Sequence, residues 1–437
     1  MTNFSKILKL NLTSLNIYLI LLFPVMLIVG PLITEISILC IVILSYPNLY
    51  IKKNIKFNRF ILIYLLVFLL YLLINTLFNS ISIELSFKNS FFYFRFFLYA
   101  YLIFIYLDMD EKFFFKKLYL IISIIILLFY FDFVAKMIFI ETFFENKKYT
   151  RFSSMFGDEK ILGSYLIKIL PVFIICTYLY KKNLKLVFFW ILLIGLLIIL
   201  SGERTAFISY IFLILGIMIR PKFFKSTIVS ILIFFSLYAS LLLMENKAAK
   251  RIFYSTIEQI YLAENDKKLF SVVHENMILQ SYLIFKENIY FGTGPKTYRI
   301  ACKNKSYNEK ILSRIEDYDL ERLKINKSPH ARRDACETHP HNLLAQVISE
   351  LGLIGIIFYI IFYYCLIKEF FFSLTLDENK NKYVFPYYIS ILALGINFCP
   401  LIPSGNFFNN WYSYAIYYPL GFFLFFNYKL RKLDNKT

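Results

Sequence analysis

The sequence predicts an all-α integral membrane protein with about 12 transmembrane helices and one large loop outside the membrane. Three observations predict this class. Apolar residues make up 59% of the chain, which exceeds their usual share in soluble domains. Runs of about 20 apolar residues, the length that crosses a bilayer, recur with short polar connections between them. A single long polar stretch, from about 245 to 342, interrupts the pattern.

Hydropathy divides the chain into three segments. Residues 1–244 carry the first nine spans, residues 245–342 form the large loop, and residues 343–437 carry the last three spans. The loop contains two helix-like stretches, at 246–263 and 272–289, and the second has an apolar face typical of a helix lying on a membrane. The expected spans are 14–30, 32–50, 60–78, 91–107, 118–140, 164–180, 184–201, 205–219, 226–244, 343–367, 383–403 and 410–427.

The charge distribution predicts the orientation. The net charge is +19, and much of the Lys and Arg lies in every second short connection, so it indicates the cytoplasmic side rather than nucleic-acid binding. Both termini are therefore expected in the cytoplasm. The connections 141–163, 201–205 and 245–342 are expected on the other side, which in a bacterium is the periplasm or the outer surface.

Cysteine placement agrees with that orientation. Four cysteines lie in apolar spans, whereas Cys302 and Cys336 both lie in the large loop. An oxidising compartment would let these two pair, and the chain-entropy model gives about 3–4 kcal/mol for a loop of this length. We expect a Cys302–Cys336 disulfide; the alternative is two free thiols.

The histidines gather in one region. All four, His274, His330, His339 and His341, lie in the large loop. His339-Pro340-His341-Asn342 directly precedes an apolar span, so Pro340 is expected at the first helical position with Thr338 or His339 as cap. The positive end of the helix would then keep His341 neutral, as a general base must be. Asn342, Gln346 and Glu350 would continue a polar face into the bilayer. A solvated turn is the simpler alternative.

Arginines supply candidate anion ligands on the same side of the membrane. Arg204 and Glu203 occupy the very short connection Ser201-Gly202-Glu203-Arg204-Thr205, where a charge is costly unless it has a function. A guanidinium binds phosphate in a bidentate manner. Arg151, before the span at 164–180, and Arg299, after Gly292-Thr293-Gly294-Pro295, are further candidates. A simple Glu203–Arg204 pair at the membrane edge is the alternative for the short connection.

Other sequence patterns give weaker evidence for a functional site. Asp108-Met109-Asp110 and Asp317-Tyr318-Asp319 match a metal-binding spacing, but the first lies on the cytoplasmic face and the second in a mixed-charge run. Two histidines are too few for a structural zinc site. We expect no catalytic metal and no cofactor, and nucleotide-binding loops are absent from the sequence. His274 reads as a surface histidine outside the main site, and Arg95 either reaches the membrane edge or contributes to the site.

These motifs together resemble the O-antigen ligase family, whose shared region also occurs in O-antigen polymerases. Each motif alone is weak, but their order, spacing and common membrane side are characteristic. The resemblance rests on Arg151-Phe152-Ser153 with Gly157-Asp158-Glu159, on Ser201 to Phe207, on Gly292 to Pro295, and on His339-Pro340-His341-Asn342 followed by Gln346, Glu350 and Gly352-Leu353-Ile354-Gly355.

The resemblance implies a GT-C-like glycosyltransferase fold and a reaction in the periplasm, at the inner membrane. Such proteins transfer a glycan from undecaprenyl pyrophosphate to an acceptor, in ligases a sugar of the lipid A core, without metal. His341 and Arg204 match the family's functional histidine and arginine. Arg204 would stabilise the leaving pyrophosphate, with Arg151 or Arg299, while Glu203, His339 and Asn342 would line the substrate site. His341 would either accept the acceptor's proton or orient the pyrophosphate.

Two alternatives stay open. The turn reads Gly-Glu-Arg instead of the Ser-x-Ser-Arg pattern associated with many ligases, so a polymerase that extends the lipid-linked glycan is equally compatible with the residues. A transporter or flippase is the third possibility, although such proteins place polar residues near the bilayer midplane, often in repeated halves. This sequence has no visible repeat, and its polar residues gather at one face.

Overall fold

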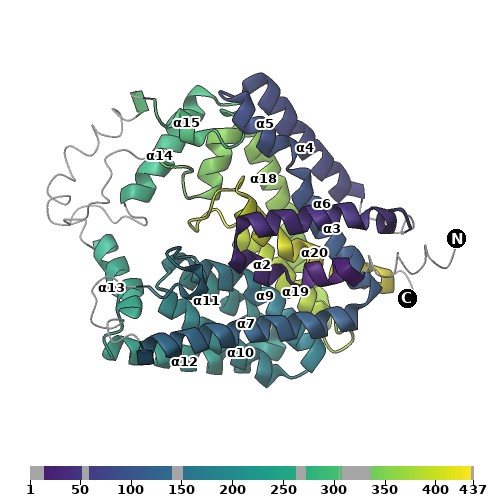
Figure 1. Ribbon diagram of the computed structural model, residues 1–437, viewed down its shortest axis with the longest axis vertical. Coiled ribbons are helices and arrows are strands. Elements are labelled where there is room, and N and C mark those ends of the chain that lie inside the picture. Colours follow the sequence, from purple (N-terminus) through teal and green to yellow (C-terminus); the bar gives the residue numbers. More distant parts are fainter. Residues whose placement is uncertain are drawn as a thin grey trace.

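The protein is a helical bundle with a cap of shorter helices at one end (Figure 1). The cap consists of α13 (Lys247–Tyr261), α14 (Val272–Glu287) and α15 (Tyr298–Ala301). This computed structural model describes residues 14–51, 59–139, 151–261, 272–304, 306–307 and 336–434. His330 and the Asp317-Tyr318-Asp319 motif lie outside these ranges. Within them, six segments are long and apolar enough to cross a membrane: Ile83–Met109, Glu111–Ile138, Leu162–Lys181, Leu184–Ser201, Pro221–Leu243 and Leu343–Thr375.

The expected spans fall largely on helical segments, but residues 398–403 of the expected span 383–403 are not helical. Residues 14–21 are helical, and the remaining helices of the bundle are α2 (Phe23–Val29), α3 (Pro31–Ile51), α4 (Arg59–Asn79), α5 (Ile83–Phe91), α6 (Phe94–Met109), α7 (Glu111–Phe139), α9 (Leu162–Lys181), α10 (Leu184–Ser201), α11 (Arg204–Met218), α12 (Pro221–Leu243), α18 (Leu343–Thr375), α19 (Val384–Asn397) and α20 (Asn410–Asp434). Shorter pieces are η1 (Ser154–Phe156), α13 (Lys247–Tyr261), α14 (Val272–Glu287) and α15 (Tyr298–Ala301).

Helix α9 occupies the centre of the bundle. It contacts α7, α10, α11, α19 and α20, and its residues from Tyr165 to Thr177 are buried without interruption. Apolar residues all round a helix are typical of one enclosed by other helices. One of these buried residues, Lys168, is charged.

The basic connections that the structure describes gather at one end of the bundle, as their alternation predicted; residues 52–58 lie outside the described residues. Lys382 Nζ lies 2.9 Å from a Glu111 oxygen, which joins the α18–α19 connection to the start of α7. Arg220, between α11 and α12, donates to the Ser373 carbonyl at 3.0 Å near the end of α18. Helices α13 and α14 lie at the opposite end from the last residues of α20 (Figure 1).

Helix α18 is broken at Gly352, where φ is 62°. The turn after α14 fills this break. Leu353 N–H donates to Ile289 O at 2.8 Å, and Thr293 N–H donates to Ser349 O at 3.0 Å. A side chain at Gly352 would meet the Gly292 nitrogen at 2.5 Å, so both positions need glycine. The Gly-Thr-Gly-Pro turn is thereby fixed against α18.

The sequence predicts that α14 lies with its apolar face on the membrane. In the structure this face packs inside the protein instead. Helix α14 contacts α18, and Ile284 is fully buried in a small second core with Tyr298, Cys302 and Tyr307. The apolar face is therefore used to pack the cap together, because the disulfide and the following turn supply an apolar partner within the protein.

Candidate active site

The short connection between α10 and α11 is held by the start of α9. Glu203 is the N-cap residue of α11, and its carboxylate accepts from Gly163 N–H at 2.7 Å and from the Ser164 N–H and hydroxyl at 3.1 and 2.6 Å. The first amides of a helix have no internal partner and carry partial positive charge, so they favour an anion. Glu203 is thus a fixed part of the scaffold, and Arg204 begins α11 beside it.

Arg151 braces the same connection. Its Nε donates to Ser201 O at 3.3 Å and its Nη2 to Lys160 O at 2.7 Å, and the guanidinium lies 3.8 Å from the Glu203 carboxylate. The ion pair of Glu203 is therefore formed with Arg151. Burial lowers the pKa of Arg151. The charge of Glu203 opposes this shift, whereas the nearby charge of Arg251 lowers the pKa further.

Pro340 was expected as the first helical residue of α18, with Thr338 or His339 as the N-cap, and both expectations are wrong by three residues or more. The helix begins at Leu343, and Asn342 is its cap, with Oδ1 accepting from Ala345 N–H at 2.9 Å. Asn342 is one of the strongest N-cap residues, and its Nδ2 also donates to Pro400 O at 2.7 Å. His341 therefore lies just before the helix, in a left-handed conformation with φ 51°. The Ser404 N–H holds it there by donating to His341 O at 2.8 Å.

Three histidines cluster at this point. The ring centroids of His339 and His341 are 4.0 Å apart, and those of His274 and His341 are 6.0 Å apart. Burial, together with the charges of His341 and Arg204, lowers the pKa of His274 to about 4. His274 is thus close to both residues expected to act on substrate. All three histidines have lowered pKa values, chiefly through burial, so neutral imidazoles face the site at neutral pH.

Two residues of this cluster were missed in the sequence. The sequence predicts a surface position for His274, although this residue shares its polar stretch with the other three histidines. Arg251, on α13, is not among the residues that the sequence predicts for the site. Its charge acts on Arg151, and its Nε is buried with no hydrogen-bond partner among the described residues. Only tertiary packing brings α13 and α14 to the α10–α11 connection.

A cavity of about 800 Å³ adjoins the cluster. This volume suits a small-molecule site. His339 and Arg299 line it, and so do Ser164, Thr205 and Lys168. The Nε of Arg299 and the Nε2 of His339 are buried without a hydrogen-bond partner in the described part of the chain. Such buried polar atoms are costly unless a ligand or water satisfies them. The remaining wall comes mainly from the α2–α3 turn, residues 155–167, the start of α11 and residues 396–412.

Glu350 fixes the position of Arg299. Its two carboxylate oxygens accept from Lys296 N–H and Tyr298 N–H, both at 2.9 Å. Gln346 donates to Glu350 at 3.0 Å and to Asn406 Oδ1 at 2.9 Å. The polar face expected on α18 therefore exists, and it ties the Gly-Thr-Gly-Pro turn to the segment before α20.

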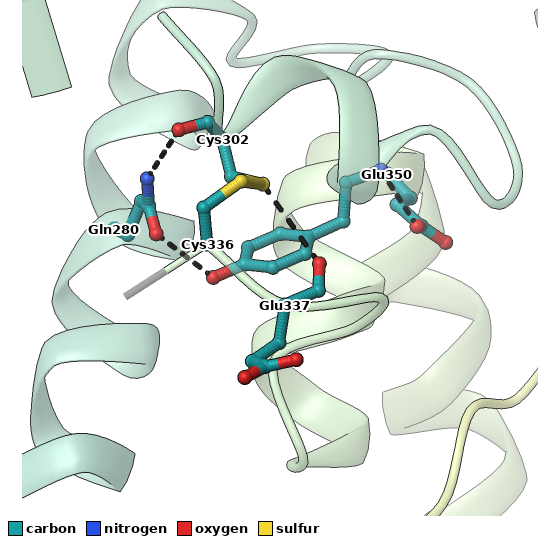
Figure 2. The surroundings of a disulfide bond; sticks show 6 residues. Gln280, Cys302, Cys336, Glu337 and Glu350 are labelled. Carbon is teal, nitrogen blue, oxygen red and sulfur yellow. Dashed lines mark hydrogen bonds between the residues drawn. A yellow bond between two sulfur atoms is a disulfide. The ribbon is translucent and has the colours of Figure 1, made fainter. Parts of the chain in front are cut away.

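A disulfide closes the cap. Cys302 and Cys336 are bonded, with Cα atoms 5.1 Å apart, as the sequence led us to expect. Figure 2 shows Gln280 beside the bond, where it donates to Cys302 O at 2.8 Å. Tyr298 in turn donates its hydroxyl to Gln280 Oε1 at 3.1 Å. The disulfide anchors the chain five residues before His341.

Arg95 is not part of this cluster. It lies near the start of α6, where its Nε is 3.1 Å from Glu35 and its Nη2 donates to Asn410 at 2.7 Å. Among the described residues, no group of three or more His, Cys, Asp and Glu side chains is arranged to hold a metal ion.

The family comparison covers most of these parts. Residues 187–360 match the family model described as O-antigen ligase. This match supports the O-antigen ligase and polymerase family. A search of curated proteins found no match.

The matched region takes in the α10–α11 connection, α13, α14, the glycine turn, the disulfide and His341. Arg151 and Lys168 lie before it, and residues 396–412 lie after it. The cavity is therefore built partly from the matched region and partly from the rest of the chain. The family implies a lipid-linked glycan substrate, a membrane environment and an enzyme of the ligase or glycosyltransferase type.

Proposed function

We propose that this protein is an O-antigen ligase that transfers a glycan from undecaprenyl pyrophosphate to the lipid A core at the periplasmic face of the inner membrane. The observation that supports it most is the meeting of Arg204, His274 and His341 beside a cavity lined by Arg299, whose Nε has no hydrogen-bond partner among the described residues. A GT-C-like arrangement of about 12 spans belongs to the same proposal.

The proposed reaction needs few groups. The oxygen of an acceptor hydroxyl bonds to the anomeric carbon of the glycan, while the bond from that carbon to the diphosphate oxygen breaks and the diphosphate leaves with its electrons. The hydroxyl proton passes to a base. Positive charge fixed beside the leaving oxygen stabilises the transition state. Arg204 supplies this charge, with Arg299, which lines the cavity, as a second cation.

His341 is suited to accept the proton of the acceptor hydroxyl. Burial lowers its pKa, which keeps the ring neutral and able to accept a proton. The alternative is that His341 orients the diphosphate. His274, also neutral, lies near enough to hold the ring of His341 in place.

A lipid-linked substrate also needs an apolar path. An apolar groove of about 830 Å³ runs between α4, α6, α18 and α20. Phe398 and Phe407 line its wall, and their chain neighbours Cys399 and Asn406 line the polar cavity. The groove and the cavity are thus separated by one segment, which suits a ligand with a polyprenyl tail and a polar head.

The proposed orientation of the protein in the membrane rests on the distribution of its basic residues. Lysines and arginines occupy every second connection, and these gather at the end opposite the site. Positively charged connections favour the cytoplasm, so the site is proposed to face the periplasm with both termini in the cytoplasm. Cysteine-substitution labelling with an impermeant thiol reagent tests this: a cysteine introduced at Lys303 should react in intact spheroplasts, and one introduced at Lys225 should not.

A polymerase that uses the same donor is the second candidate, because the Gly-Glu-Arg connection departs from the pattern of many ligases. Deletion of the gene distinguishes the two. Loss of a ligase leaves bare lipid A core and polymer on the carrier lipid, whereas loss of a polymerase leaves core with a single repeat unit.

A transporter is the less favoured candidate, and His341→Ala distinguishes it. An enzyme should keep its expression and lose glycan transfer by about 100-fold or more, the typical contribution of a general base. Lys303→Ala, an exposed change near the disulfide, should transfer normally. Full transfer by purified His341→Ala protein would contradict an enzymatic role for this site.

A further inference from the structure

Lys168 is a charged residue in the interior of the bundle. It lies six residues after Leu162, the first residue of α9, which at 1.5 Å per residue places it about 9 Å below the helix start. Its side chain is 8% exposed. A lysine at this depth is costly, and such residues commonly mark functional sites in membrane proteins.

No carboxylate among the described residues neutralises Lys168. Glu203 is the acidic side chain whose charge acts on it, but the Glu203 oxygens accept from the first turn of α9 and lie against Arg151. No ion pair within 4.0 Å joins Lys168 to Glu203 in the described chain. The contact that Lys168 does make is with the ring of Tyr412, whose centroid is 4.5 Å from Nζ. An aromatic face attracts a cation but does not neutralise it.

Lys168 lines the same cavity as Arg299 and His339. The latter two come from the cap, so the cavity has basic side chains from the membrane interior and from the cap. The Nε of Arg299 has no partner in the described structure. Hydroxyl and amide side chains of Ser164, Thr205, Asn406 and Asn409 complete the polar lining. This combination fits an anion that also carries hydroxyl groups.

We infer that Lys168 is a further anion-binding residue of the donor site, which contacts the diphosphate of the lipid-linked glycan from the membrane side, in the cavity that Arg299 also lines. This inference rests on the proposed function and adds a residue to it. A charge-assisted bond to a phosphate oxygen is among the stronger polar contacts in proteins. A carboxylate of an acidic sugar has related chemistry and is the other source of the anion.

The alternative is a purely structural lysine that packs against Tyr412. The two possibilities differ in their effect on ligands. A structural lysine affects stability equally with and without ligand, whereas an anion ligand affects the response to the ligand itself.

The experiment compares wild type, Lys168→Met, Lys168→Arg and Lys181→Met, each purified as the full chain in detergent. Lys181 is a matched control, because it also lies on α9 and over aromatic rings but at the other end of the helix. Thermal unfolding is measured with and without inorganic pyrophosphate, farnesyl diphosphate and glucuronate. Transfer assays then give KM separately for donor and acceptor.

We expect pyrophosphate and farnesyl diphosphate to raise the unfolding temperature of wild type and Lys181→Met, and not of Lys168→Met. We expect the donor KM of Lys168→Met to rise by about tenfold to 100-fold, the range for loss of a charged hydrogen bond, with the acceptor KM unchanged. Lys168→Arg should keep part of the response. If Lys168→Met does not yield folded protein, Lys168→Arg decides, with a donor KM above that of wild type.

Equal diphosphate responses and equal donor KM values in wild type and both Lys168 variants would overturn the inference. A response to glucuronate alone would overturn the assignment of the diphosphate. The ligand-binding measurement does not require turnover, so it separates this inference from the proposed function. If His341→Ala transferred glycan normally while Lys168→Met still lost the diphosphate response, the proposed function would fail and the binding site would stand.

Discussion

The imidazole rings of His274 and His341 lie with their centroids 6.0 Å apart, although one residue belongs to α14 and the other precedes α18. The charge of Arg204, from the start of α11, acts on His274 as well. His274 therefore links the two residues that the family resemblance implies, and it is placed to orient His341.

We predict that His274→Ala lowers transfer by about 100-fold, the effect of a displacement of about 1 Å at a reacting group. The loss should fall mainly on kcat, because the substrate-binding cations remain. Tyr282→Ala, an exposed change on the same helix, is the control. Steady-state kinetics of the purified variants measure both values. Wild-type kcat in His274→Ala would show that His341 is positioned without it.

Acid should destabilise the protein through its histidines. The pKa values of His274 and His339 are lowered to about 4 and about 3, from 6.5 in the unfolded chain. The unfolded chain therefore binds protons at a higher pH than the folded protein does. The stability from neutral histidines is complete above about pH 6.5 and is lost as the pH falls toward about 4.

The measurement is the unfolding temperature as a function of pH. We expect little change between about pH 7 and 8 and a decline below about 6.5. His274→Phe should decline less steeply, because it removes one group that the unfolded chain protonates. Parallel curves for the variant and wild type would argue against a lowered pKa at His274.

Gly352→Ala should destabilise the protein strongly. Gly352 has φ 62°, and an added Cβ would lie 2.5 Å from the Gly292 nitrogen. Backbone strain of this kind costs about 1–3 kcal/mol, and displacement of the glycine turn adds to it. Gly395→Ala is the matched control, since its nearest neighbour would be a Leu366 methyl at 3.7 Å. Thermal unfolding should separate the two variants by several degrees. Equal unfolding temperatures would mean that the break in α18 tolerates a side chain.

Reduction of the disulfide should loosen the site. The bond closes a loop with a sequence separation of 34, for which the chain-entropy model gives about 3–4 kcal/mol. We expect Cys302→Ser with Cys336→Ser to unfold at a lower temperature and to lose transfer, because the chain before His341 is released from α15. Cys40→Ser is the control. If the double variant kept both wild-type stability and activity, the disulfide would be dispensable for holding the cap.

Several features could be predicted from local sequence alone. Apolar runs of membrane length located the helices, because crossing a bilayer constrains each segment independently of its neighbours. Alternation of the connections then placed Arg204, Arg299 and His341 at one end, where the structure also has them. The same alternation placed Cys302 and Cys336 in one compartment, and the structure bonds them.

Only the tertiary structure decided which of these residues meet and what each one does. In the structure, the carboxylate of Glu203 binds the first amides of α9, and Asn342 is the N-cap residue of α18. The structure also brings His274 and Arg251 to the site. It also enclosed Lys168 in a cavity with residues far away in the chain. The physical reason is that hydropathy and capping act over a few residues, whereas the distance between two helices depends on how all the side chains between them pack.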